Sequence, residues 1–178
     1  GSFERYKADK ARVYEHTQVA CIFNTDHVDT LRMVENADVI EGARAIGFSS
    51  TEMPAVSMLG LAEDIMVDRA FLKNRYNEAY ELAVLEDLAP APGKMPAKHT
   101  VENALAAAAL CRAADIDPKA VGAGLRSFKT GAHRNQLVGY ANDIMWVNDS
   151  KATNPHAANA SMSGYPSLVW IAGGLSKG

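Results

Sequence analysis

The sequence predicts an α/β fold, because short apolar runs of strand length alternate along the chain with longer helical patterns. The chain has 178 residues, 48% of them apolar and 22% charged, which is enough to bury a sizeable core. A formal net charge of −3 gives no electrostatic reason to expect a nucleic acid or a membrane surface as partner. The longest strongly apolar run, 104–111, is far short of the ~20 residues that a membrane-spanning helix needs.

The first quarter of the chain alternates helix and strand. Apolar spacing near i, i+3 and i+7 predicts a helix at the start of the chain. Two short buried strands follow, with a short helix between them and a turn after the second. The predicted ranges are helix 3–15, strand 19–24, helix 29–37, strand 43–48 and turn 49–51.

The pattern weakens between residues 56 and 88. Residues 65–72 could form an antiparallel strand with one face in water, and residues 80–88 fit a strand or a helix equally. The composition of residues 90–93 predicts a loop.

Two consecutive helices follow, and they are the clearest elements of the sequence. Beginning near Thr100, five residues line one face of an alanine-rich helix: Val101, Ala104, Leu105, Ala108 and Ala109. Asp117 and Pro118 then supply an N-cap acceptor and a proline at the first helical position, which predicts a second helix to about Phe128.

A linker is predicted around Gly131, at residues 130–132. Residues 136–140 and 144–147 could pair as a hairpin, and residues 154–162 form a helix. Residues 168–172 have the pattern of a buried strand that runs into a glycine-rich stretch. Because a buried strand needs neighbours and covering helices, we expect the chain to be a segment of a longer protein.

The two cysteines, Cys21 and Cys111, stand in apolar surroundings without the spacing of a metal site. We expect two buried, reduced thiols, as is usual in a cytoplasmic protein. The P-loop pattern GxxxxGK[ST], the GxSxG elbow and the HExxH zinc motif are all missing from the sequence.

The segment 146–154, WVNDSKATN, is the most promising functional candidate. It places a run of polar residues between a predicted buried strand and a helix, where open α/β sheets bind ligands. Asp149 could accept hydrogen bonds from sugar hydroxyls, and Lys151 could meet a phosphate or a carboxylate. Helix capping and turn formation explain the same residue types equally well.

Three further positions have a functional and an ordinary interpretation. Arg134, after His133, could bind a phosphate or a ribose, or be a solvated surface residue. Asn103 could present its amide to a base edge, or be exposed to solvent. Lys10 by itself fits a solvated helix face.

Taken together, these segments resemble the Mur ligases, the ATP-dependent amino-acid ligases of peptidoglycan synthesis, and within them the members that add D-glutamate. The resemblance rests on YKADKARVYE (6–15), HTVENALAA (99–107), AHR (132–134) and WVNDSKATN (146–154), with support from IAGGLSK (171–177). It implies that residues 1–131 are the latter part of a central ATP-binding domain with a mixed sheet. Residues 132–178 would begin a Rossmann-like, C-terminal, glutamate-binding domain.

The resemblance also implies roles for individual residues. It places the binding of ATP at Asn103, His133, Arg134, Asp149 and Lys151. Thr100 stands where family members often have Asn, which leaves a nucleotide contact at that position open.

The remaining implied roles concern the amino acid and the metal. Thr153 and Lys177 would bind the carboxylates of D-glutamate, the second substrate being UDP-N-acetylmuramoyl-L-alanine. Lys10 and Lys151 would be the catalytic lysines, and Lys10, as a carbamate, would be an oxygen ligand of Mg²⁺. The implied reaction passes through an acyl phosphate, and the chain alone is expected to be inactive because the family's phosphate-binding loop would lie upstream of it.

Two other functions fit the residues. One is a different ATP-dependent amide ligase of the same superfamily, with another acceptor pocket. The other is an α/β binding module without catalysis, in which Arg134, Asp149 and Lys151 would be only caps and surface charges.

Overall fold

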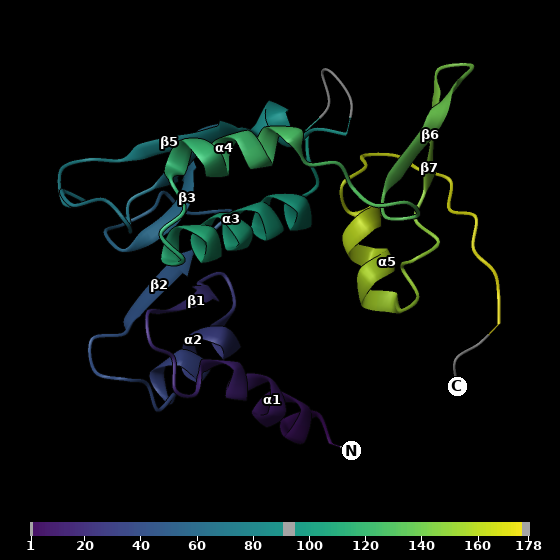
Figure 1. Ribbon diagram of the computed structural model, residues 1–178. Helices are drawn as coiled ribbons and strands as arrows, with labels where there is room; N and C mark the ends of the chain where they lie inside the picture. Colours follow the sequence, from purple (N-terminus) through teal and green to yellow (C-terminus); the bar gives the residue numbers. More distant parts are fainter. Residues whose placement is uncertain (1, 91–94, 176–178) are drawn as a thin grey trace. The chain divides into compact units, whose positions relative to one another are not determined.

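The computed structural model describes residues 2–90 and 95–175, which fall into two compact units, unit 1 and unit 2, that divide between Lys129 and Thr130. Among the described residues, unit 1 carries a mixed five-stranded sheet covered by helices (Figure 1). Unit 2 carries a two-stranded sheet and a helix. The predicted α/β class with a mixed sheet is confirmed.

The sheet of unit 1 has the order β1-β2-β3-β4-β5. The first three strands are parallel, and β4 is antiparallel to both β3 and β5. Parallel neighbours need a crossover, which α2 (Val28–Glu35) supplies between β1 and β2. A two-residue turn suffices between β3 and β4. The strands are β1 (Ala20–Asn24), β2 (Arg44–Phe48), β3 (Met58–Ala62), β4 (Ile65–Asp68) and β5 (Tyr80–Val84).

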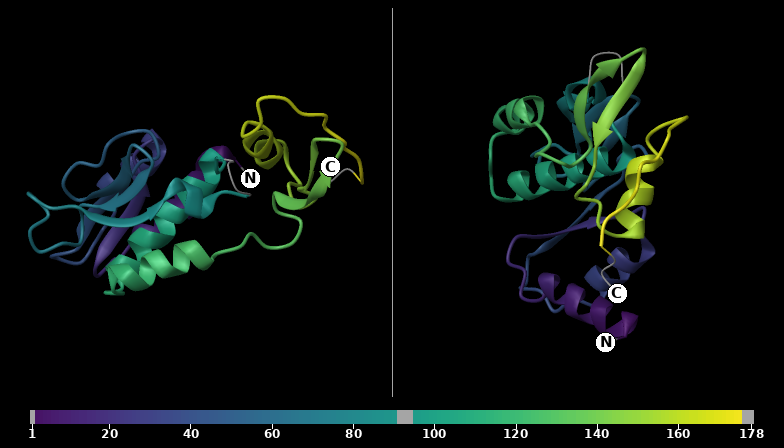
Figure 2. Two further views of the ribbon diagram at one scale, coloured as in Figure 1. Left: turned by 90° about the horizontal axis from the view of Figure 1, so that it is seen from above. Right: turned by 90° about the vertical axis from the view of Figure 1, so that its right-hand side faces the viewer.

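Helices α3 (Lys98–Ala113) and α4 (Pro118–Ser127) pack side by side on the sheet, α3 against β1 to β3 and α4 against β5 (Figure 2). The five residues predicted to line one face of α3 are all buried, which confirms that prediction. The predicted start of α4 is confirmed too, since the Asp117 side chain accepts a hydrogen bond from the Lys119 N–H at 2.8 Å.

The antiparallel strand expected at residues 65–72 is confirmed as the shorter β4, but the face that it was expected to leave in water is buried. Strand β4 ends at Asp68, whose side chain is completely buried. Its carboxylate accepts hydrogen bonds from the backbone N–H groups of Ala70 and Phe71, at 2.7 and 2.9 Å, and from Arg112 Nε at 3.0 Å. Asp68 therefore ends the strand by capping the turn that follows it, and it pairs with a helix far away in the sequence.

Residues 80–88, which fitted a strand or a helix, contain both. Strand β5 passes directly into the 3₁₀ helix η2 (Leu85–Leu88). The Asp87 carboxylate accepts a hydrogen bond from the Val84 N–H at 3.1 Å, and this bond marks the change. Strand β3 was not predicted, because its five residues carry no alternation of polar and apolar side chains. Of the predicted loop 90–93, all but Pro90 lies outside the described residues.

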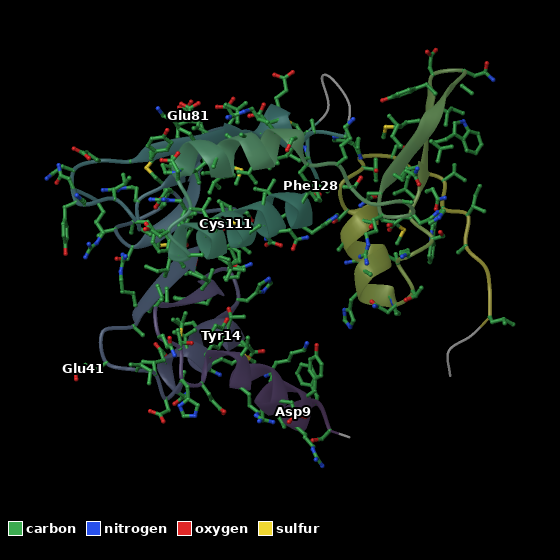
Figure 3. The ribbon with its side chains drawn as sticks, viewed as in Figure 1. Asp9, Tyr14, Glu41, Glu81, Cys111 and Phe128 are labelled. Atoms are coloured by element: carbon green, nitrogen blue, oxygen red, sulfur yellow. The ribbon has the colours of Figure 1, made fainter. Side chains whose placement is uncertain are left out.

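The predicted N-terminal helix is confirmed as α1 (Phe3–Ala11) followed by the 3₁₀ turn η1 (Arg12–Tyr14). Its apolar stripe is exposed, with Phe3 66% and Val13 75% accessible to solvent. Polar contacts hold this segment instead. Lys7 Nζ lies 2.9 Å from Asp29 Oδ1, and the hydroxyl of Tyr14, labelled in Figure 3, donates to the Ile22 carbonyl at 3.1 Å.

In unit 2, the hairpin of β6 (Gln136–Ala141) and β7 (Ile144–Asn148) is confirmed, as is helix α5 (Pro155–Met162). Asn142 and Asp143 form the turn with φ of 51° and 61°, the left-handed conformation that tight hairpins require.

Two expectations for unit 2 are wrong. The strand that contains Trp146 is not buried, since this side chain is 49% exposed. Residues 168–172 form no strand, and Val169 is 92% exposed. Within the described residues no other strand pairs with this segment, and extended backbone needs such a partner to become a strand.

Cys21 is buried and Cys111, labelled in Figure 3, is half-buried; neither forms a disulfide. Among the described residues, none of the helices has the length and the apolar character needed to cross a membrane.

Candidate functional site

Two loops of unit 2 lie side by side and bring together most of the predicted site residues. One precedes β6 and contains His133 and Arg134; the other joins β7 to α5 and contains Asp149 and Lys151. The Lys151 N–H donates to the His133 carbonyl at 3.1 Å, and the Asn135 N–H donates to Asp149 Oδ1 at 3.0 Å. These bonds fix the two loops against each other.

The second loop folds through its own hydrogen bonds. The Ala152 N–H donates to the Asp149 carbonyl at 2.9 Å, and the Asn154 side chain caps α5 by accepting from the Ala157 N–H at 2.8 Å. The interpretation of this segment as caps and turns is therefore correct for Asn154 and for Asn148, whose side chain accepts from the Ser150 N–H at 3.1 Å. It does not account for Lys151 and Thr153, whose side chains are exposed.

Asp149 is the half-buried centre of this site. Besides the Asn135 N–H, its carboxylate accepts a hydrogen bond from the Ser161 hydroxyl on α5, at 2.5 Å between Oγ and Oδ2. A carboxylate offers roughly four acceptor positions. Two local bonds therefore leave Asp149 able to accept hydrogen bonds from a ligand.

Arg134 and Lys151 are cations of the same two loops that hold Asp149. Both side chains are exposed, and no ion pair of the described residues includes either of them. The ring of His133 is exposed as well, with Nδ1 3.0 Å from Asn148 Nδ2. Two loops that carry two exposed cations and a half-buried carboxylate offer groups for a ligand with both phosphates and hydroxyls.

The predicted residues Asn103 and Lys10 belong to unit 1, and Lys177 lies outside the described residues. Asn103 is exposed on α3, next to Glu102, whose carboxylate lies 3.5 Å from Ser50 Oγ just after β2. Asn103 thus stands near the carboxyl end of a parallel strand, where ligands of α/β proteins bind. Lys10 is exposed on α1, with Nζ 5.6 Å from the centre of the Tyr6 ring.

A polar cluster at the carboxyl ends of β1 and β2 was not predicted. The Asp26 carboxylate accepts hydrogen bonds from the hydroxyls of Ser49, Ser50 and Thr51, at 2.6, 3.2 and 2.8 Å, and from the Ser50 N–H at 3.1 Å. Burial alone would raise the pKa of Asp26, but these hydrogen bonds outweigh it and hold the pKa below its ordinary value. Because these hydrogen bonds satisfy the carboxylate, the cluster joins the loop after β1 to the loop after β2.

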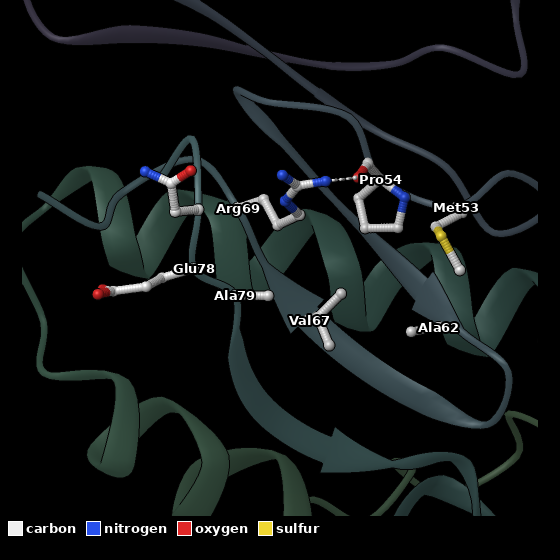
Figure 4. A pocket seen from close by; sticks show the side chains of 8 residues that line it. Met53, Pro54, Ala62, Val67, Arg69, Glu78 and Ala79 are labelled. Atoms are coloured by element: carbon white, nitrogen blue, oxygen red, sulfur yellow. Dashed lines mark hydrogen bonds between the residues drawn. The ribbon is translucent and has the colours of Figure 1, made fainter. Parts of the chain in front are cut away.

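Unit 1 also has an open pocket of about 240 Å³, lined by residues that include Met53, Val67, Arg69 and Glu78 (Figure 4). The Arg69 guanidinium beside it donates to the Pro54 carbonyl at 3.2 Å. None of the predicted site residues lines this pocket. No group of three or more potential metal-ligating side chains occurs in the described ranges 2–90 and 95–175.

Three participants in the site were missed: Asn135, Ser161 and Tyr165. Asn135 directly follows a predicted residue and could have been included on that ground. Ser161 could not have been found, because its partner Asp149 is 12 residues away and no helical spacing relates the two. Tyr165 is 30 residues from its partner Asn135.

Comparison with known proteins relates the chain to a group of enzymes. No protein-family model matches the chain. It is 51% identical over 178 residues to a UDP-N-acetylmuramoylalanine--D-glutamate ligase of Leifsonia xyli, 49% identical to one of Streptomyces avermitilis and 40% identical to one of Mycolicibacterium smegmatis. Each match covers all of this chain and 34%, 37% and 33% of the relative, so the chain spans about a third of the length of these relatives. The resemblance to the Mur ligases is thereby confirmed, and over its whole length the chain is homologous to one segment of the UDP-N-acetylmuramoylalanine--D-glutamate ligases.

Proposed function

We propose that this chain is part of a ligase that uses ATP to join D-glutamate to UDP-N-acetylmuramoyl-L-alanine in peptidoglycan synthesis. The observation that carries the proposal is the identity of 40–51% to relatives of that name over the entire chain. The arrangement in unit 2 agrees with it, because Arg134, Asp149 and Lys151 lie in two loops that are hydrogen-bonded to each other.

In the proposed reaction, a carboxylate oxygen of UDP-N-acetylmuramoyl-L-alanine attacks the γ-phosphorus of ATP, and ADP leaves. The amine of D-glutamate then attacks the carbonyl carbon of the acyl phosphate, and inorganic phosphate leaves with the P–O bond intact. The carbon–oxygen bond to phosphate breaks in this second step, and the amine loses a proton to solvent. Negative charge develops on the transferring phosphoryl oxygens in the first step and on the former carbonyl oxygen and the leaving phosphate in the second, so cations beside these oxygens lower the barrier.

Each predicted residue has a place in this proposal. Arg134 and Lys151 offset phosphate charge, and Asp149 accepts hydrogen bonds from sugar hydroxyls. His133 keeps Nε2 for the nucleotide, since Nδ1 contacts Asn148. Three further roles follow from the resemblance: Asn103 at the adenine, and Thr153 and Lys177 at the carboxylates of D-glutamate.

Mg²⁺ does not fit the described residues by themselves, because they offer no set of three ligands. The exposed amine of Lys10 is accessible to carbon dioxide, and its carbamate would add one oxygen ligand. We derive no catalytic step through the metal.

The test is an assay of the full-length protein that contains this chain. Release of phosphate should require ATP, D-glutamate and UDP-N-acetylmuramoyl-L-alanine together, and L-glutamate should not replace D-glutamate. Lys151→Ala should lower kcat/KM by about 10²-fold, the usual loss when one group that stabilises transition-state charge is removed.

Lys119→Ala is the matched control, since Lys119 is also an exposed lysine and lies on α4 of unit 1. Its activity should stay near that of the unchanged protein. Equal activities of the two variants would refute the role of Lys151, and ligation without D-glutamate would refute the proposed reaction.

A further inference from the structure

We propose that Asn135, Ser161 and Tyr165 are positioning residues, which hold the Asp149 carboxylate in the orientation that accepts two neighbouring hydroxyls of a ligand. This inference rests on the proposed function, in which Asp149 contacts the nucleotide sugar. It extends that function to three residues that do not touch the ligand themselves.

The hydrogen bonds among these residues form a continuous chain. Asp149 Oδ1 accepts from the Asn135 N–H at 3.0 Å, and Asp149 Oδ2 accepts from Ser161 Oγ at 2.5 Å. Asn135 Nδ2 donates to Ser161 Oγ at 3.2 Å, and the Tyr165 hydroxyl donates to Asn135 Oδ1 at 3.4 Å. Each carboxylate oxygen therefore has a donor of its own, and rotation of the carboxylate would break both bonds.

The donors come from three parts of unit 2. Asn135 lies in the loop before β6, Ser161 lies on α5, and Tyr165 lies just after α5. Asn135 and Ser161 bond to the two oxygens of Asp149, and Tyr165 bonds to the Asn135 amide, so separate segments hold the carboxylate. Pre-organised groups of this kind bind a ligand more tightly, since they lose little conformational freedom on binding.

The backbone conformation of Asn135 also helps to position Asp149. Its φ is 46°, in the left-handed region that asparagine adopts more readily than most residues. This conformation directs the Asn135 N–H toward Asp149 while the side chain reaches Ser161. Asn135 thus helps to position Asp149 through its backbone N–H and, by way of Ser161, through its side-chain amide.

Tyr165 stays a hydrogen-bond donor at neutral pH. Burial, together with the charge of Asp149 and the proximity of Tyr140, raises the pKa of the Tyr165 hydroxyl above its ordinary value. The proton therefore remains on the hydroxyl and keeps the Asn135 amide oriented with its Nδ2 toward Ser161.

The ligand group that suits this carboxylate is a pair of adjacent hydroxyls. Each oxygen of Asp149 has one acceptor position in addition to the one used by its protein donor. A vicinal diol, such as that of a ribose, would donate to both oxygens at once.

The experiment compares three serine variants in the full-length protein. Ser161→Ala removes the hydroxyl, Ser161→Thr keeps it, and Ser163→Ala removes an exposed hydroxyl near the end of α5 that bonds to the Ala160 carbonyl. Ser161→Ala should raise KM for ATP about tenfold, the loss expected for one hydrogen bond to a charged group, with kcat changed much less. Ser161→Thr and Ser163→Ala should keep KM within about twofold of the unchanged protein.

A second readout separates positioning from a general loss of structure. The preference for ATP over 2′-deoxy-ATP, measured as a ratio of kcat/KM values, should fall in Ser161→Ala and stay unchanged in Ser163→Ala. A Ser161→Ala variant that loses activity equally with both nucleotides would overturn the positioning role.

Asp149→Asn distinguishes this inference from the function on which it rests. If Asp149→Asn leaves KM for ATP unchanged, the proposed contact of Asp149 with the nucleotide is wrong. If Asp149→Asn raises KM and Ser161→Ala does not, the positioning role is wrong and the proposed function stands.

Discussion

Replacing Asp68 would remove the acceptor shared by a buried guanidinium and two backbone N–H groups. The Asp68 side chain is fully buried and that of Arg112 is 9% exposed, so water cannot take over these bonds. The contacts join the end of β4 to the last turns of α3. Asp68→Asn would remove the charge and keep an acceptor, whereas Asp68→Ala would remove both.

The structure sets the expected magnitudes. Removing one partner of a buried ion pair costs about 3–5 kcal/mol. Arg112 would keep hydrogen bonds to the carbonyls of Ile116 and Phe71, so Asp68→Asn should lie near the lower end, at about 3 kcal/mol. Asp68→Ala also orphans the N–H groups of Ala70 and Phe71, at about 1 kcal/mol each, for a total of about 5 kcal/mol.

Urea unfolding followed by circular dichroism measures this loss in unit 1, which contains α3 and α4. With a slope of about 2 kcal/mol per molar urea, Asp68→Asn should lower the midpoint by about 1.5 M. Both tryptophans of the chain, Trp146 and Trp170, lie in unit 2, so their fluorescence follows unit 2 in the same samples.

Asp64→Asn is the control, because Asp64 is an exposed carboxylate in the turn between β3 and β4. It should move the midpoint by less than about 0.3 M, as expected for a surface substitution. The reasoning would be refuted if Asp68→Asn and Asp64→Asn unfolded at the same urea concentration.

Three more predictions concern unit 1. A Cβ on Gly122 would lie 2.4 Å from the Leu82 carbonyl oxygen, whereas one on Gly124 in the same helix would meet nothing within 4 Å. Gly122→Ala should therefore lower the thermal midpoint and Gly124→Ala should stabilise by about 0.5–1 kcal/mol, and the opposite order would contradict this packing. The lowered pKa of Asp26 means that its contribution to stability is full above its unfolded-state pKa and is lost as the pH falls through the folded-state value. Asp26→Asn should thus flatten the loss of stability below about pH 4, and an unchanged acid limb of the stability curve would count against the cluster. Asp117→Ala should cost about 1 kcal/mol through loss of the α4 cap, measured by urea unfolding; no change would show that the Lys119 N–H finds another acceptor.

Local sequence patterns were sufficient for the elements that their own residues stabilise. Helix α3 was predicted with its buried face because five residues repeat at helical spacing. The cap of α4 and the hairpin of unit 2 were predicted because Asp117 and the Asn142-Asp143 turn act over a few residues. The loop after β7 was singled out as a candidate site because its polar residues are consecutive in the sequence.

Predictions failed where a residue depends on a distant partner. Residues 65–72 were expected to leave one face in water, but Asp68 is buried there because it pairs with Arg112 on α3. Trp146 and Val169 were expected to be buried, because apolar runs usually pack against neighbours. Both side chains are exposed in the structure, and the local pattern of apolar residues does not specify whether another segment packs against them.

The sequence by itself determined the α/β class, most helices and the polar residues at the end of β7. Spacing along a chain reflects helical and strand periodicity, and the turn and cap residues act within a few positions. Only the tertiary structure decided that Asp68 pairs with Arg112 inside unit 1, and that Ser161 and Asn135 together hold Asp149. The physical reason is that hydrogen bonds and ion pairs form between groups that folding brings within about 3 Å, whatever their separation in sequence.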